Sequence, residues 1–138
     1  MSPSSPTIDV SVVILFDGPR MLVNRRPEGS YFGGWWEWPG GKREGDESAL
    51  QCARRELREE IGYDAPGLRE YAVREVDYPG RRVRLTFFVG RKPDGAAASP
   101  GALEHRWMPP EDVRSLQFLE PNLPVLEQII AHPPFARI

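Results

Sequence analysis

Three glutamates in one short stretch are the residues whose types and spacing point most directly to chemistry. Glu56, Glu59 and Glu60 lie in the segment 55–62, R-E-L-R-E-E-I-G, which is rich in strong helix formers and closes on a glycine. On a helix, residues three and four apart are neighbours, so the three carboxylates gather on one flank. This cluster has two interpretations: a solvated acidic face balanced by nearby arginines, or a site for hard divalent cations, which prefer clustered oxygen ligands.

The same helix needs an apolar face that holds these carboxylates against the rest of the protein. Apolar residues recur at spacings of three and four and predict such a stripe. Its members are Leu50, Ala53 (or Arg54), Leu57 and Ile61.

Cys52 is the sole cysteine, which excludes an internal disulfide, and its small apolar neighbours predict a packed thiol rather than a reactive one.

Read together with the residues upstream, the segment resembles the Nudix box. That motif reads Gly, five residues, Glu, seven residues, then Arg-Glu-aliphatic-x-Glu-Glu-x-Gly-aliphatic. The matching residues are Gly41, Glu47, Arg55, Glu56, Leu57, Glu59, Glu60 and Gly62. Every fixed position therefore agrees in identity and spacing, and the one departure is Tyr63, which stands at the closing aliphatic position.

The resemblance implies an enzyme that hydrolyses a nucleoside diphosphate linked to another group. It implies that Glu56, Glu59 and Glu60 are metal ligands, with the Gly41 carbonyl as a backbone ligand. Mg²⁺ is the expected ion and Mn²⁺ a substitute, because carboxylates are the usual protein ligands of Mg²⁺.

The other residues of the box have implied roles that the sequence leaves less specific. Arg55 orients a neighbouring carboxylate. Glu47, expected in the first turn of the helix, either holds a metal-bound water or caps the helix. Three glutamates stay open as general base: Glu56, Glu60 and Glu104, the last of which lies in a later loop.

Three further segments resemble the MutT-like branch of that family, whose members hydrolyse nucleoside triphosphates, typically 8-oxo-dGTP, to the monophosphate and pyrophosphate. W-W-E-W-P-G-G-K resembles L-E-F-P-G-G-K and places Trp38 beside the base pocket. N-R-R resembles T-R-R and assigns a nucleotide contact to Arg26. F-L-E-P-N-L-P-V-L resembles F-P-P-A-N-E-P-V-I and assigns the reading of a purine edge to Asn122.

Two of these pocket assignments carry an alternative or a departure. Asn122 also suits a plain helix N-cap, a position that asparagine favours. Arg81 corresponds to a further pocket arginine, but Gly80 stands where the branch has an aspartate.

The alternative substrates are CTP, 5-methyl-dCTP and a dinucleotide. A non-catalytic nucleotide sensor is a further alternative, against which the intact glutamates count.

The length and net charge of the chain limit the classes of protein to which it can belong. A chain of 138 residues fits one domain, predicted over residues 1–138, with 1–6 as a flexible arm. The net charge of −2 gives no basic surface for a stable nucleic-acid complex, whereas a nucleotide held through metal ions is compatible with it. No signal peptide or transmembrane stretch is evident, so we expect a cytoplasmic protein without a membrane partner, as a monomer or homodimer.

The order of predicted elements gives the architecture. The predicted strands are 8–16, 21–24, a short extended run 35–39, a hairpin formed by 68–78 and 82–89, and 106–108; the predicted helices are the box helix, a helical start at 109–113 and 123–131, entered through Asn122 as N-cap. This order predicts an α/β fold with a mixed sheet covered by helices on both faces. The Nudix resemblance implies the same α/β/α sandwich.

Overall fold

A strand that is buried on both faces forms the middle of the protein. The computed structural model describes residues 6–135. In it, β1 (Thr7–Asp17) is buried from Ser11 to Phe16. It pairs in parallel with β6 (Arg81–Arg91) from Thr7↔Arg82 to Phe16↔Arg91. The continuous apolar run predicted a strand of this kind, and its place at the sheet's centre explains why both faces are apolar.

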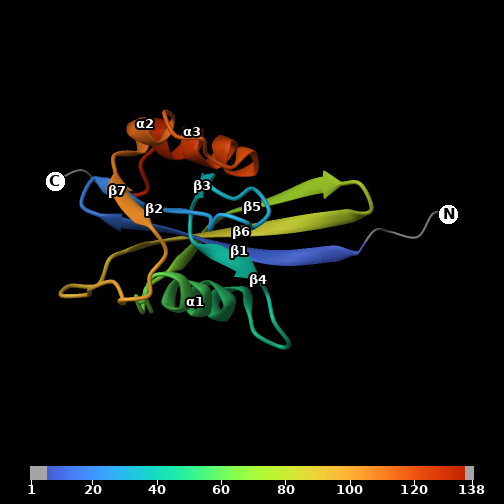
Figure 1. Ribbon diagram of the computed structural model, residues 1–138, viewed down its shortest axis with the longest axis horizontal. Helices are drawn as coiled ribbons and strands as arrows, with labels where there is room; N and C mark the ends of the chain where they lie inside the picture. The colour runs from blue at the N-terminus through green and yellow to red at the C-terminus, as the bar shows by residue number, and fades with distance from the viewer. Residues whose placement is uncertain (1–5, 136–138) are drawn as a thin grey trace.

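One mixed sheet of seven strands is built around β1 in the described residues (Figure 1). The order is β3-β2-β1-β6-β5, while β4 also pairs with β1 and β7 pairs with β2. The remaining strands are β2 (Arg20–Arg25), β3 (Trp36–Glu37), β4 (Gly40–Lys42), β5 (Arg69–Tyr78) and β7 (His105–Met108). The predicted strands are thus confirmed to within a few residues, and β4 is an addition that the sequence did not reveal.

Helices cover both faces of this sheet, as predicted (Figure 1). α1 (Ala49–Glu60) packs on one face, where Leu57 and Ile61 join Val13 and Leu15 in a buried cluster. The short helix α2 (Pro110–Val113) and α3 (Leu123–Ala131) lie on the other face, with the 3-10 turn η1 (Glu120–Asn122) leading into α3. The α/β/α arrangement is confirmed.

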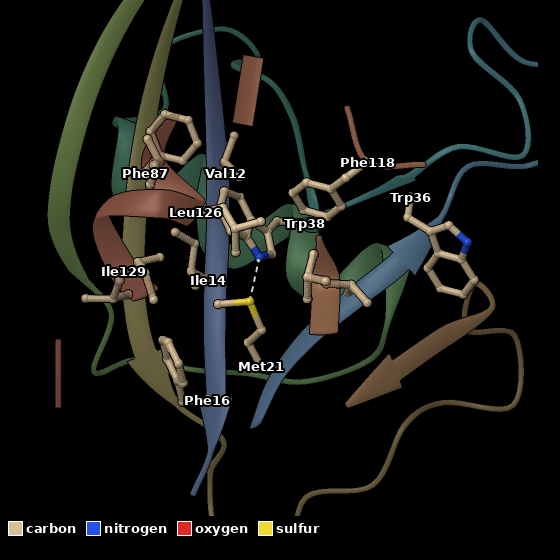
Figure 2. Close-up of a cluster of buried hydrophobic side chains, with 14 of the residues drawn as sticks. Val12, Ile14, Phe16, Met21, Trp36, Trp38, Phe87, Phe118, Leu126 and Ile129 are labelled. Atoms are coloured by element: carbon tan, nitrogen blue, oxygen red, sulfur yellow. Dashed lines mark hydrogen bonds between the residues drawn. The ribbon is translucent and has the colours of Figure 1, made fainter. Parts of the chain in front are cut away.

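The core beneath α3 is organised around an indole ring (Figure 2). Trp38 is 1% exposed and meets Phe118 and Phe87 edge to face, with ring centroids 5.1 and 6.0 Å apart. Its Nε1 donates to the sulfur of Met21 at 3.4 Å. Tryptophan is amphipathic and needs a partner for its N–H when buried, and here methionine supplies one.

Two sequence expectations about α1 were wrong. Leu50 is 36% exposed, and the buried stripe consists of Cys52, Ala53, Leu57 and Ile61.

The helix also begins later than expected, because Ser48 is its N-cap. Ser48 Oγ accepts from Gln51 N at 3.1 Å, and the Gln51 side chain accepts from Ser48 N at 2.7 Å. This capping box fixes the helix start beyond Glu47. The buried thiol of Cys52 agrees with its predicted packing role, and residues 1–5 of the predicted arm lie outside the described part.

We expect Leu57→Ala to lower the free energy of unfolding by about 2–5 kcal/mol, because it leaves a cavity between α1 and the sheet. Leu50→Ala is the matched control on the same helix and should cost about 0.5 kcal/mol or less, since Leu50 is at the surface. Urea denaturation of both variants checks this. Equal losses would mean that α1 packs through a different face.

Candidate active site

Arg55 is the centre of the acidic cluster on α1. Its guanidinium donates to both carboxylate oxygens of Glu47, Nε to Oε2 at 3.0 Å and Nη2 to Oε1 at 2.7 Å. Nη1 reaches Glu56 Oε1 at 2.8 Å and Glu59 Oε2 at 3.1 Å, and Nη2 donates to the Lys42 carbonyl at 3.0 Å. One arginine thus contacts and compensates three carboxylates. A planar five-donor fork is suited to such multiple contacts.

The backbone of β4 brings the glycine loop against these carboxylates. β4 pairs with β1 through Ser11↔Gly41 and Val12↔Gly40, so its position is set by the central strand. The Gly40 N–H donates to Glu60 Oε1 at 2.8 Å. A Cβ at Gly41 would lie 2.5 Å from the Glu56 carboxylate. The close approach therefore requires glycine, as the box motif has it.

Glu37 belongs to this site, and sequence reasoning missed it. Its side chain is mostly buried, with Oε1 3.0 Å from Arg26 Nη1 and Oε2 accepting from Asn24 Nδ2 at 3.3 Å. It lies close enough to raise the pKa of Glu60 through charge repulsion. A signal was available: Trp36 and Trp38 are both buried, so the strand alternation of W-E-W turns Glu37 to the other side.

Burial and charge set the protonation of the acidic cluster. Burial raises the pKa of Glu60 to about 8; the Gly40 N–H opposes this, and the charges of Glu37 and Glu56 add to it. Burial also raises the pKa values of Glu37 and Glu56. Hydrogen bonds from Arg55 lower the pKa of Glu47 to about 2. Carboxyl groups with raised pKa values and one with a lowered pKa therefore lie close together in this cluster.

The donor set suits a hard divalent cation. It consists of the carboxylates of Glu56, Glu59 and Glu60 next to the backbone of Gly41, which is oxygen chemistry of the kind that such ions prefer. Within residues 6–135, no three acidic, histidine or cysteine side chains already converge on one point. Arg55 and the Gly40 N–H instead engage the carboxylate oxygens that a cation would use.

A cavity of about 720 Å³ opens beside this cluster. Its floor is apolar and is formed by strands β1, β5 and β6, with Ile8, Val10, Val12, Val76, Val83 and Leu85. Gly40, Gly41 and Glu37 line it at the carboxylate cluster. The four residues predicted to bind substrate all line it as well: Arg26, Trp38, Arg81 and Asn122. The structure therefore brings together residues that span almost one hundred positions of sequence.

Asn122 differs from the simple helix cap that the sequence also allowed. It occupies the position before α3, but its side chain makes no capping hydrogen bond. It is 6% exposed and faces the cavity. Next to it, the Arg74 guanidinium donates to the Pro121 carbonyl and ties η1 to β5. The N-cap interpretation of the asparagine side chain is therefore wrong.

The other pocket residues have neighbours that qualify their predicted roles. Trp38 is a core residue that also lines the cavity, and the Arg81 guanidinium lies 5.5 Å from the centroid of the Tyr78 ring. Glu104, a candidate base, is half-exposed and lies 3.4 Å from Arg25 Nη1. It is not part of the cavity lining, whereas Glu37 is.

Comparison with known proteins identifies the family. The model of the NUDIX domain matches residues 6–129. The chain belongs to the Nudix family. A CTP pyrophosphohydrolase of Escherichia coli K12 is 34% identical over 125 residues, covering 88% of this chain and 90% of that protein. An 8-oxo-dGTP diphosphatase of Proteus vulgaris is 41% identical over 69 residues, 50% of this chain and 62% of that protein.

A solved structure supports the same branch. The MutT structure from a study of Aliivibrio salmonicida and Vibrio cholerae MutT superimposes with a TM-score of 0.74 at 30% identity, covering 91% of this chain and 98% of that one. The protein is thus a MutT-like Nudix hydrolase that acts on nucleotides, and the sandwich fold that the motif implied is confirmed. Nudix hydrolases generally use divalent metal ions. No helix in the described residues is long and apolar enough to span a membrane.

The raised pKa of Glu60 predicts how the metal-free enzyme responds to pH. Between about 4.5 and about 8, the folded state retains a proton that the unfolded chain has released, so stability falls as pH rises through this window. Glu60→Gln removes that titration, and its melting temperature should fall less across the window than that of the wild type. Calorimetry in excess chelator measures this.

Glu47→Gln provides a control of opposite sign for that measurement. Because the pKa of Glu47 is lowered to about 2, its ionised carboxylate stabilises the folded state at pH values above its ordinary pKa of 4.5. This stabilisation is lost as the pH falls from 4.5 toward about 2. This variant should be less stable than the wild type at neutral pH. A Glu60→Gln profile parallel to the wild-type profile would contradict the assignment of a buried protonated carboxyl.

Proposed function

We propose that the enzyme hydrolyses a purine nucleoside triphosphate, with 8-oxo-dGTP as the leading candidate, to the monophosphate and pyrophosphate. One observation carries the proposal: a single cavity runs from Gly40 and Gly41, which lie against the Glu60 and Glu56 carboxylates, over an apolar floor to the buried Asn122. The Proteus vulgaris relative of that name, which resembles half of this chain, supports the choice of substrate.

The cavity offers a different kind of contact to each part of a nucleotide. The apolar floor suits the face of a base. Asn122 has one acceptor and two donors, enough for two hydrogen bonds to a base edge. Arg26 and Arg81 supply positive charge for the phosphates, with Arg26 fixed by Glu37 on the side of the carboxylates.

The carboxylates of Glu56, Glu59 and Glu60, with the Gly41 carbonyl, would hold Mg²⁺, for which Mn²⁺ can substitute. When bound, such an ion neutralises phosphate charge and acidifies a water. Arg55 keeps Glu56 and Glu59 in place, and Glu47 anchors that arginine through two hydrogen bonds. Among the candidate bases we favour Glu56 and Glu60, because their carboxylates lie against Gly41 and Gly40, which line the cavity. The carboxylate of Glu104 is paired with Arg25 instead.

CTP is the second candidate substrate. The observation that favours it is the Escherichia coli CTP pyrophosphohydrolase, which matches this chain over 88% of its length. The same apolar floor would take a pyrimidine, and an asparagine amide can pair with a cytosine edge as well. 5-Methyl-dCTP and a dinucleotide remain in the panel of substrates to be tested. The proposal also includes a cytoplasmic location and no stable nucleic-acid complex.

A panel of nucleotides with Mg²⁺, scored for pyrophosphate and for the nucleotide product, tests the proposal. Chelator should abolish turnover, and Glu59→Gln should lower kcat by orders of magnitude while leaving the fold intact, because Glu59 is 58% exposed and loses a charge rather than packing. Glu70→Gln removes the same charge from an exposed position on β5 and is the control. Wild-type turnover by Glu59→Gln would show that these glutamates are a solvated face.

Asn122→Ala tests the purine preference. Loss of a buried pair costs about 1–3 kcal/mol, so kcat/KM for a purine triphosphate should fall by one to two decades and for a pyrimidine triphosphate far less. The melting temperature should change little, since the side chain makes no capping bond. An equal loss for purines and pyrimidines would remove the base-reading role and leave the hydrolase assignment standing.

A further inference from the structure

Two adjacent aromatic side chains at the rim of the cavity, Tyr31 and Phe32, belong to neither buried core cluster. Tyr31 is 75% exposed and Phe32 is 46% exposed, yet both line the substrate cavity. They belong to the loop 26–35 between β2 and β3. Large aromatic side chains left in solvent beside a ligand cavity are a mark of a binding surface.

The loop is held in a defined shape although these rings are exposed. Arg26 Nε donates to the Tyr31 carbonyl at 2.6 Å, and the Arg26 backbone N–H donates to the Trp35 carbonyl at 2.8 Å. Gly34 N in turn donates to the Arg26 carbonyl at 2.9 Å. Since Arg26 also pairs with Glu37, the position of the rings is tied to the carboxylate end of the cavity.

Phe32 holds a backbone conformation that is costly for a bulky residue. Its φ is +57°, and it is the one non-glycine residue with positive φ in the described part of the chain. Phe32 stays 46% exposed and joins neither buried core cluster. A strained residue beside a binding cavity that contributes little to the core points to a functional demand on the side chain.

The rings of Tyr31, Phe32 and Trp35 form a continuous row. Tyr31 and Phe32 meet at 4.4 Å between centroids, and Phe32 meets Trp35 at 5.6 Å, both edge to face. At the other rim, the Tyr78 ring is already covered by the Arg81 guanidinium. In residues 6–135, no cation lies over the Tyr31 or Phe32 ring. The ring surface that the edge-to-face contacts leave exposed is therefore available to a flat ligand.

We propose that Tyr31 and Phe32 form a stacking surface for the base of the bound nucleotide, and that this surface favours two-ring bases. The inference rests on the proposed function and adds a determinant of base specificity that is separate from Asn122. The asparagine contacts the edge of the base, and the Tyr31 and Phe32 rings stack on its face. Stacking on an aromatic side chain depends on ring area and tolerates different edges. It would therefore raise affinity for purine nucleotides, oxidised or not.

The test compares Y31A/F32A with Y31F/F32Y, which retains both rings. The alanine variant should raise KM for a purine triphosphate roughly tenfold and leave kcat within about twofold, because stacking binds substrate and transition state alike. The aromatic variant should behave as the wild type. Val73→Ala, at an exposed position on β5 outside the cavity lining, is the control for loss of surface hydrophobicity.

A base-free substrate separates stacking from a general effect of the loop. Hydrolysis of ribose 5-triphosphate should be unchanged in the alanine variant; an equal loss on this compound would mean that the loop acts by placing Arg26, and would overturn the proposal. An unchanged KM for purine triphosphates would overturn it as well. If that result came with a wild-type dimer that the substitution dissociates, the rings would be a subunit contact instead.

Binding measured without turnover distinguishes a failure of this inference from a failure of the proposed function. GMP, titrated calorimetrically in chelator, should bind the wild type and Y31F/F32Y with similar affinity and Y31A/F32A roughly tenfold more weakly. If the wild type hydrolyses no triphosphate but shows this difference, the proposed function fails and the stacking surface stands. If all three proteins bind GMP equally, the stacking surface fails whatever the enzyme hydrolyses.

Discussion

The gathering of carboxylates on α1 is the constraint on which the rest of the site depends. Like charges three and four residues apart repel one another, and partial burial makes their ionised forms still less favourable. Arg55 offsets this by hydrogen bonding to Glu47, Glu56 and Glu59 together. Glu60 is handled in another way, through the Gly40 N–H and a raised pKa. The cluster thus combines carboxylates that an arginine compensates with one whose pKa burial raises.

The fold serves this cluster through a few positioning elements. The capping box at Ser48 fixes where α1 begins and therefore which face its glutamates occupy. The short strand β4 presses the glycine backbone against them because it is paired with the buried central strand β1. Residues Gly40 and Gly41 allow that approach, since any side chain would collide with β1 backbone or with a carboxylate. The geometry of the candidate site is therefore a consequence of sheet pairing.

Much of the fold was readable from the sequence because its signals are local. The buried run at β1, the hairpin β5–β6 and the amphipathic α1 follow from hydrophobic period and turn residues, which act over a few positions. The box motif was readable for the same reason: its residues lie close together in the chain, from β4 through one loop to α1 and the turn that follows it. Local geometry and chemistry are sufficient to place Arg55 beside its glutamates.

Other features depended on contacts between segments that are distant in sequence. The sequence left open whether Asn122 caps α3 or faces the cavity, and the packing of η1 against β5 through Arg74 decides for the cavity. Glu37 joins the site because β3 pairs with β2, which aligns it with Asn24. Leu50 faces outward because Ala53, Leu57 and Ile61 form the face of the helix that packs on the sheet. By itself, the sequence determined the elements and the reactive motif. The tertiary structure decided which side chains line the cavity, because strand pairing and helix register are set by burial across the whole sheet.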